Sequence, residues 1–251
     1  MKSIYAGLLL IAFPVSAWAL EVPGKLHWSQ RVELSTGVSG VVQTVHAQVG
    51  ERVKKGQVLA TLDARDYQAQ VVEAQAVLAR NQEDQLDAKR NLDRVEELYK
   101  RTVIATSELE AAQTRQARTI AQLNEAQARL RRAQKILGDA SLRAPFDALI
   151  LARQVEPGQI VASQFQPQAL FVIARAGEMI ARAQVNLAHI NQLKIGDAVT
   201  VEVNQQSYRG QIKTLGLEPV EDKGAIGYPV EVLFVVKEVL RAGTPVTLKL
   251  R

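Results

Sequence analysis

The most regular hydrophobic pattern in the chain lies between Asp66 and Leu137, where apolar positions recur every seven residues. The first run is Val71, Leu78, Gln85, Leu92 and Tyr99, and a second position three residues after each of the first four holds Ala74, Asn81, Ala88 and Val95. The pattern breaks at residues 101–106. It then resumes with Leu109, Gln116, Leu123, Leu130 and Leu137, and three residues after each of the first four stand Ala112, Thr119, Ala126 and Ala133. One larger and one smaller residue per heptad is typical of a coiled-coil seam. The pattern predicts two long helices over residues 65–138.

The ends of these helices carry capping signals. Asp63 is the expected N-cap of the first helix, and residues 107–110 (Ser-Glu-Leu-Glu) have capping-box spacing for the start of the second. Gly138 is the expected glycine after the last turn. Because the break is short, the helices must run antiparallel. At 1.5 Å per residue each is roughly 45–50 Å long, so we expect the hairpin to project from the rest of the protein.

Short strands are predicted on both sides of the hairpin, over residues 32–62 and 144–172. The two sets are similar at a fixed offset of 108 residues: Val41-Val42 corresponds to Leu149-Ile150, Gly50 to Gly158 and Val53 to Val161. Matches at one offset on both sides of a helical insertion suggest an internal duplication. Two half-sheets would then pack as one small sandwich, split by the hairpin.

The last third of the chain, residues 176–251, predicts a further unit. Strands are expected over residues 179–187, 198–203, 208–215, 228–236 and 246–250, with a short helix at residues 188–193. Glycines separate several of these short segments. Closely spaced short strands of this kind favour a small antiparallel β-barrel.

The N-terminal residues 1–19 have the features of a secretory signal peptide. Lys2 supplies the positive charge, residues 6–15 form an apolar run, and small residues at Ala17 and Ala19 flank the expected cleavage site before Leu20. The alternative is an uncleaved membrane anchor, but the apolar run is shorter than the roughly 20 residues that a span requires. We therefore expect a secreted protein.

Composition narrows the possible functions. The 251 residues are 47% hydrophobic and contain no cysteine, which excludes disulfides, thiolate nucleophiles and cysteine metal sites. The formal net charge is +5, and removing residues 1–19 removes one lysine and no acid, which leaves +4. Acidic residues are interleaved with the basic ones and no basic block with aromatics occurs, so nucleic acid is not an expected partner.

No pattern of catalytic or cofactor-binding residues is present. The three histidines, His27, His46 and His189, lie in different segments without paired spacing. Soft-metal ligands are limited to Met1 and Met179. We therefore expect no enzyme activity, no cofactor and no metal.

The strand segments resemble those of periplasmic adaptor subunits, the HlyD-like membrane fusion proteins of bacterial tripartite efflux and secretion systems. The resemblance rests on Val38–Val42 with Val49–Leu59, and on Leu142–Asp147 with Glu156–Val161. It implies a mixed α and β, elongated fold. The expected domains are a lipoyl-like (biotinyl-like) sandwich split between residues 20–64 and 139–175, the α-helical hairpin at 65–138, and the β-barrel at 176–251.

Lipoyl and biotinyl carriers provide a remote alternative. They hold a modifiable lysine on the turn between the two halves of their domain. In this chain the hairpin occupies that place and is entered at Asp63-Ala64-Arg65, which contains no lysine. We therefore rank a swinging-arm carrier far below an adaptor.

The expected partner-binding site is the hairpin tip. Its residues are Arg94, Leu98, Tyr99, Lys100, Arg101, Thr102, Val103, Ile104 and Ala105. Apolar residues at the end of a projecting arm indicate a partner; alternatively, Val103 and Ile104 fold back and close the hairpin. In adaptors that meet channels of the TolC type, the tip carries an arginine, a leucine four residues later and a serine seven beyond that. Arg94 and Leu98 fit, and Ala105 occupies the serine position.

The resemblance implies an adaptor that bridges an inner-membrane transporter of the resistance-nodulation-division (RND) type and a TolC-type outer-membrane channel, for export of small molecules. An ABC-type exporter or secretion system is the alternative. Several copies would associate into a ring in the assembled complex, with charged residues such as Arg90, Glu97, Arg115 and Arg118 available to bridge neighbours. Many adaptors add a fourth, membrane-proximal domain, which we do not expect here. The expected location is the periplasm.

Overall fold

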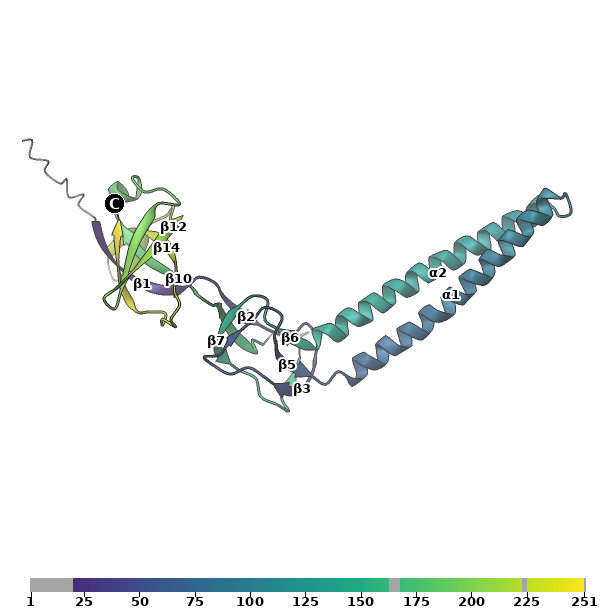
Figure 1. Ribbon diagram of the computed structural model, residues 1–251, viewed down its shortest axis with the longest axis horizontal. Coiled ribbons are helices and arrows are strands. Elements are labelled where there is room, and N and C mark those ends of the chain that lie inside the picture. Colours follow the sequence, from purple (N-terminus) through teal and green to yellow (C-terminus); the bar gives the residue numbers. More distant parts are fainter. Residues whose placement is uncertain (1–19, 163–167, 223–224, 251) are drawn as a thin grey trace, which may run out of the picture. The chain divides into compact units, whose positions relative to one another are not determined.

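The computed structural model describes residues 20–162, 168–222 and 225–250. The chain divides into two compact units (Figure 1). The sandwich-hairpin unit is Arg31–Ala176. The barrel unit consists of Gly177–Arg251 together with the segment that ends at Gln30. The mixed α and β class predicted from the sequence is confirmed. The predicted signal peptide, residues 1–19, lies outside the described residues.

Two helices form the predicted antiparallel hairpin: α1 (Arg65–Lys100) and α2 (Thr106–Asp139) (Figure 1). With 36 residues, α1 is about 54 Å long at 1.5 Å per residue. Buried seam residues are Val71, Ala74, Asn81, Ala88 and Leu92 on α1, and Ala112, Thr119, Ala126 and Ala133 on α2. Most are small, because close approach of the two backbones encloses short side chains. The longer seam residues, such as Leu78, Leu123 and Leu130, are half-buried along its edges.

The helix ends differ from the predicted caps. The N-cap of α1 is Ala64, although Asp63 does accept a hydrogen bond from the Arg65 N–H at 3.1 Å. Helix α2 begins at Thr106, one residue before the predicted capping box, and its N-cap Ala105 offers no side-chain acceptor. Helix α2 also continues through Gly138 to Asp139. Gly138 is helical, and Lys135 and Asp139 form an ion pair across this last turn.

Two four-stranded sheets form the sandwich. One has the order β2 (Arg31–Leu34), β9 (Phe171–Arg175), β7 (Ala148–Arg153), β4 (Arg52–Val53); the other has the order β6 (Ser141–Arg143), β5 (Val58–Leu62), β3 (Gly40–Val45), β8 (Ile160–Val161). Phe171, Leu170, Ile173, Ile150 and Leu59 are the largest fully buried side chains between them. At the hairpin base, Tyr67 packs against this core and donates a hydrogen bond from its hydroxyl to the Ser39 carbonyl oxygen at 2.6 Å. The arm is therefore fixed to the sandwich at its first turn.

The backbone of the sandwich repeats itself as the sequence offset suggested. Val42 donates its N–H to Gln159 and accepts one from Gly158; in the same way, Ile150 donates to Glu51 and accepts from Gly50. The two glycines have nearly equal positive φ angles, 86° and 87°. The strand pairs β3–β8 and β4–β7 are therefore related by internal symmetry, which supports the predicted duplication.

The barrel unit contains a closed ring of six antiparallel strands in the order β10 (Glu178–Val185), β1 (Leu20–Trp28), β15 (Pro245–Leu250), β11 (Ala198–Val203), β12 (Gln206–Leu215), β14 (Ala225–Val235); β14 pairs back to β10. A short strand β13 (Val220–Asp222) extends β14 as a hairpin, and a helical turn α3 (Leu187–Ile190) follows β10. The core of this barrel is built from alternate residues of every strand of the ring and includes Leu26, Met179, Val201, Ile212, Phe234 and Leu248.

The position of β1 differs from the prediction, which placed residues 20–64 in the split sandwich. Instead, β1 pairs with β10 and β15 of the barrel. The alternation of buried and exposed residues along β1 fits a strand of the barrel, since Val22 and Leu26 are buried whereas Lys25 is exposed. Gly24 allows the approach to β10, because a Cβ at this position would lie 2.5 Å from the Arg182 carbonyl oxygen. Such pairing joins segments more than 150 residues apart, which no local pattern could indicate.

The helices that the structure describes were compared with the length and hydropathy that a membrane span requires. Among the described residues, none of the helices contains a long enough apolar stretch to cross a bilayer. The hairpin helices are long enough, but charged residues cover their outer faces.

Candidate functional site

The hairpin turn is built by a helix C-terminal motif that sharply reverses the chain. The Val103 N–H donates to the Leu98 carbonyl oxygen at 3.1 Å, and the Thr102 N–H donates to Tyr99 at 2.8 Å. These two bonds are those of a Schellman motif, with Thr102 at the position where glycine is usual. The structure thus brings the nine predicted tip residues together at one end of the hairpin.

Thr102 adopts a backbone conformation that its side chain disfavours. Its φ is 60°, in the left-handed region. A residue with a Cβ costs roughly 1–2 kcal/mol there, and a β-branched residue is unusual in this region. Backbone strain of this kind concentrates at functional sites. The disfavoured backbone conformation of Thr102 therefore marks the turn as a candidate site, independently of the spacing of Arg94 and Leu98 in the sequence.

Apolar side chains at the tip differ in how far the hairpin covers them. Val103 is 65% exposed, whereas Leu98 and Ile104 are half-buried. Tyr99 is also exposed, and its hydroxyl lies 3.4 Å from the Thr106 hydroxyl at the start of α2. Ile104 thus helps to close the turn, as the alternative interpretation proposed. Val103 remains available to a partner.

Three of the nine predicted tip residues are basic: Arg94, Lys100 and Arg101. Arg94 donates to the neutral side chain of Asn91 at 2.6 Å and keeps its net charge. Lys100 pairs with Glu97 at 2.9 Å, and this hydrogen bond raises the pKa of the lysine. Within the described ranges, Arg101 has no ion-pair partner. The tip therefore presents two uncompensated cations beside exposed apolar side chains.

Ala105 occupies the N-cap position of α2. Its ψ of 153° is extended, as an N-cap requires, but its methyl group leaves the first N–H groups of the helix without a side-chain acceptor. We predict that Ala105→Ser stabilises the hairpin by about 1 kcal/mol, because the hydroxyl would accept a hydrogen bond from a first-turn N–H. Urea unfolding and amide exchange at residues 106–109 measure the effect. Ala105→Val, which lacks the hydroxyl, is the control, and equal stability of the two variants would contradict the prediction.

Three residues that support the tip were not assigned to it from the sequence, although Glu97 was expected to bridge neighbouring copies. Asn91, Glu97 and Thr106 hold Arg94, Lys100 and Tyr99 respectively. The Asn91–Arg94 and Glu97–Lys100 pairs have the i,i+3 spacing that places both side chains on one helix face, so the sequence alone could have indicated these two contacts. The Tyr99–Thr106 contact crosses the turn and could be found only from the conformation.

Several charges that were expected to bridge neighbouring copies have partners within the hairpin. Arg90 and Arg115 both lie near Asp87, at 3.9 and 3.8 Å, and Glu97 pairs with Lys100. These pairs are exposed, so each contributes only about 0–1 kcal/mol and exchanges partners readily. Ring formation remains a prediction.

The three histidines lie apart. His27 is on β1, His46 is in the loop after β3 within 2.9 Å of the Thr44 hydroxyl, and His189 is in α3. In the part of the chain that the structure describes, no group of three or more His, Cys, Asp or Glu side chains is arranged to hold a metal. At the hairpin tip, by contrast, apolar and cationic side chains lie close together.

The chain has a helical hairpin inserted in a duplicated sandwich, and an antiparallel barrel. A model of the CzcB-like barrel-sandwich hybrid domain matches residues 30–175, more than half of the chain. The chain therefore belongs to this family, and its resemblance to the membrane fusion proteins is confirmed.

Relatives and a solved structure agree with this family. The chain is 29% identical to the macrolide export protein MacA of Yersinia pestis over 82% of its length, and 27% identical to the multidrug resistance protein MdtA of Pantoea ananatis over 73%. It spans 60% and 46% of those two proteins. A MacA-MexA chimera containing the Pseudomonas aeruginosa MexA hairpin has the same fold, with a TM-score of 0.68 over 92% of this chain and 79% of the chimera at 23% identity.

Proposed function

We propose that this protein is the periplasmic adaptor of a tripartite efflux system. It joins an inner-membrane transporter to a TolC-type outer-membrane channel, and its hairpin tip contacts the channel. The observation that carries the proposal is the exposed Val103 at the end of a hairpin of about 54 Å, beside two uncompensated cations. Exposed apolar side chains in such a position favour a protein partner. We expect the protein to act by binding alone, without catalysis.

The transporter is proposed to be of the RND type, which exports small molecules. An ABC-type exporter is the second candidate, supported by the similarity to the macrolide export protein MacA over 82% of this chain. Affinity purification from crosslinked membranes followed by mass spectrometry distinguishes the two. Recovery of an RND transporter supports the first candidate, and recovery of an ATP-binding subunit supports the second.

The channel contact is tested by photocrosslinking in cells. A benzoylphenylalanine in place of Val103 is expected to form a covalent adduct with an outer-membrane channel. Val72, on α1 near the hairpin base, provides a matched control because it is the same residue type with nearly the same exposure, 64% against 65%. The probe at residue 72 should give no channel adduct. A channel adduct from residue 72 and none from residue 103 would contradict the proposal.

A further inference from the structure

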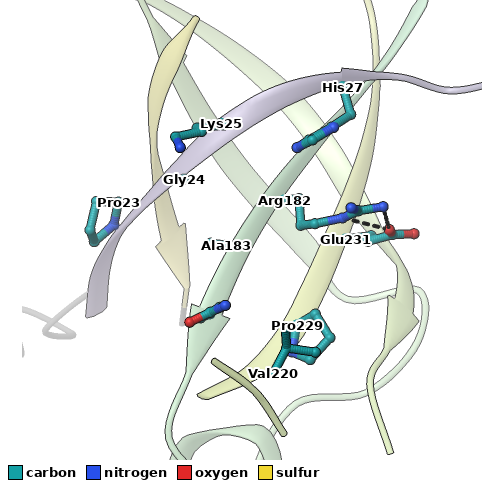
Figure 2. Close-up of a pocket in the computed structure, with 10 residues that line it drawn as sticks. Pro23, Gly24, Lys25, His27, Arg182, Ala183, Val220, Pro229 and Glu231 are labelled. Atoms are coloured by element: carbon teal, nitrogen blue, oxygen red, sulfur yellow. Dashed lines mark hydrogen bonds and ion pairs between the residues drawn. The ribbon is translucent and has the colours of Figure 1, made fainter. Parts of the chain in front are cut away.

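A groove on the outer face of the barrel has no role in the proposed channel contact. Its volume is about 570 Å³, within the roughly 300–1,000 Å³ typical of small-molecule sites. Four strands line it: β1 with Pro23, Gly24, Lys25 and His27, β10 with Arg182, Ala183 and Gln184, β13 with Val220, and β14 with Pro229 and Glu231 (Figure 2). All of these residues belong to the barrel unit.

The strand register places three charged residues in one row across this groove. Lys25 lies opposite Arg182, and Arg182 lies opposite Glu231. Arg182 donates from Nε and Nη2 to one oxygen of Glu231, at 2.9 and 2.6 Å, as Figure 2 shows. The single carboxylate of the row is thus occupied by Arg182.

Lys25 is the unmatched charge of the row. Among the described residues no carboxylate forms an ion pair with it, and its direct cross-strand neighbour is the like-charged Arg182. Like charges opposite each other on one sheet face are destabilising, by a few tenths to about 1 kcal/mol. A bound anion between Lys25 and Arg182 would remove this repulsion.

His27 supplies a neutral polar group beside the two cations. Burial, and then the charge of Arg182, lower the pKa of its imidazole. The ring is therefore mostly neutral at pH 7, and it can donate one hydrogen bond without adding charge. The groove keeps one net positive charge, from Lys25, Arg182 and Glu231 together.

The remaining wall of the groove is apolar. Pro23, Val220 and Pro229 supply two rigid rings and a branched side chain, and Val220 is 48% exposed although it is hydrophobic. An apolar wall and a cationic row in one groove are complementary to a ligand with an apolar body and an anionic end. A metal ion does not fit, because the net charge is positive.

We infer that this groove binds a small organic monocarboxylate. Its carboxylate lies between Lys25 and Arg182, and its aliphatic or aromatic body lies along Pro23, Val220 and Pro229. The ligand contacts the barrel unit alone, so the inference is independent of the channel contact at the hairpin tip.

The test uses the whole protein and decanoate as the probe. Calorimetry should detect binding of decanoate, and no binding of decyltrimethylammonium, which has the same chain length and the opposite charge. Amide NMR signals of residues 24–27, 182–184 and 230–231 should shift on titration. Lys25→Gln should weaken binding about tenfold or more, as expected for the loss of one charge-assisted contact. Lys25→Arg should bind within about threefold of the unmodified protein, because it restores the charge.

Two further variants complete the design. Val220→Asp introduces a negative charge into the apolar wall at a half-exposed position, and it should abolish decanoate binding while the barrel stays folded. Lys213→Gln removes an exposed charge from β12 outside the groove and should leave binding unchanged. The inference is wrong if decanoate does not bind, if the cation binds equally well, or if Lys25→Gln binds like the unmodified protein.

Discussion

Replacing Leu98 by aspartate is expected to reduce export to the level of a strain that lacks the protein. Leu98 lies in the last turn of α1, half-buried beside the exposed Val103. A carboxylate in this position would need to be desolvated in any apolar contact with the channel. The turn itself should persist, because Leu98 contributes to it through its backbone carbonyl. Susceptibility of cells to exported compounds is the measurement.

Leu86→Asp provides the matched control for this variant. Leu86 is a 45% exposed leucine on the same helix, twelve residues before Leu98 and away from the tip. Cells with this variant should keep their resistance. Both proteins should accumulate to the same level and show the same helical circular dichroism. If Leu98→Asp exports normally, the tip is not the channel contact.

The largest loss of stability is expected from Phe171→Ala in the sandwich. Phe171 is fully buried on β9, between β2 and β7. Removing a buried phenylalanine ring costs about 3–5 kcal/mol, through lost transfer free energy and the cavity that remains. Domains are typically stable by only about 5–15 kcal/mol, so a large part of the free energy of unfolding would be lost. Urea unfolding measures the change, and the protein should accumulate poorly in cells.

Val49→Ala is the control for Phe171→Ala. Val49 is 60% exposed in the same unit, so its loss should change the free energy of unfolding by less than about 0.5 kcal/mol. If both variants unfold at the same urea concentration, the sandwich core described above does not determine the stability of this unit.

Much of the hairpin could be predicted from the sequence because a heptad repeat is a local pattern. Positions such as Ala88 and Thr119 were assigned to the seam from spacing alone and are buried there. The helix ends could not be assigned as well. Helix α2 begins at Thr106 although residues 107–110 have better capping chemistry, and its N-cap Ala105 lies three residues after the left-handed Thr102.

Non-local pairing limited the rest of the prediction. The membership of β1 in the barrel depends on its pairing with β10 and β15, which lie far along the chain. The groove depends on the same register, since only this register places Lys25 opposite Arg182. The predicted tip residues lie together because only five residues, 101–105, separate the two helices. The left-handed backbone of Thr102 was missed because threonine rarely adopts it.

The repeated seam also determines how the length of this arm can change. Seven residues advance a helix by about 10.5 Å, close to two full turns. Deleting one heptad from α1 and the facing heptad from α2 would shorten the hairpin by about 10.5 Å and keep the small seam residues of the two helices opposite each other. A deletion that is not a whole number of heptads would rotate alanines such as Ala74 away from the opposite helix. The length of the hairpin is therefore adjustable only in discrete increments.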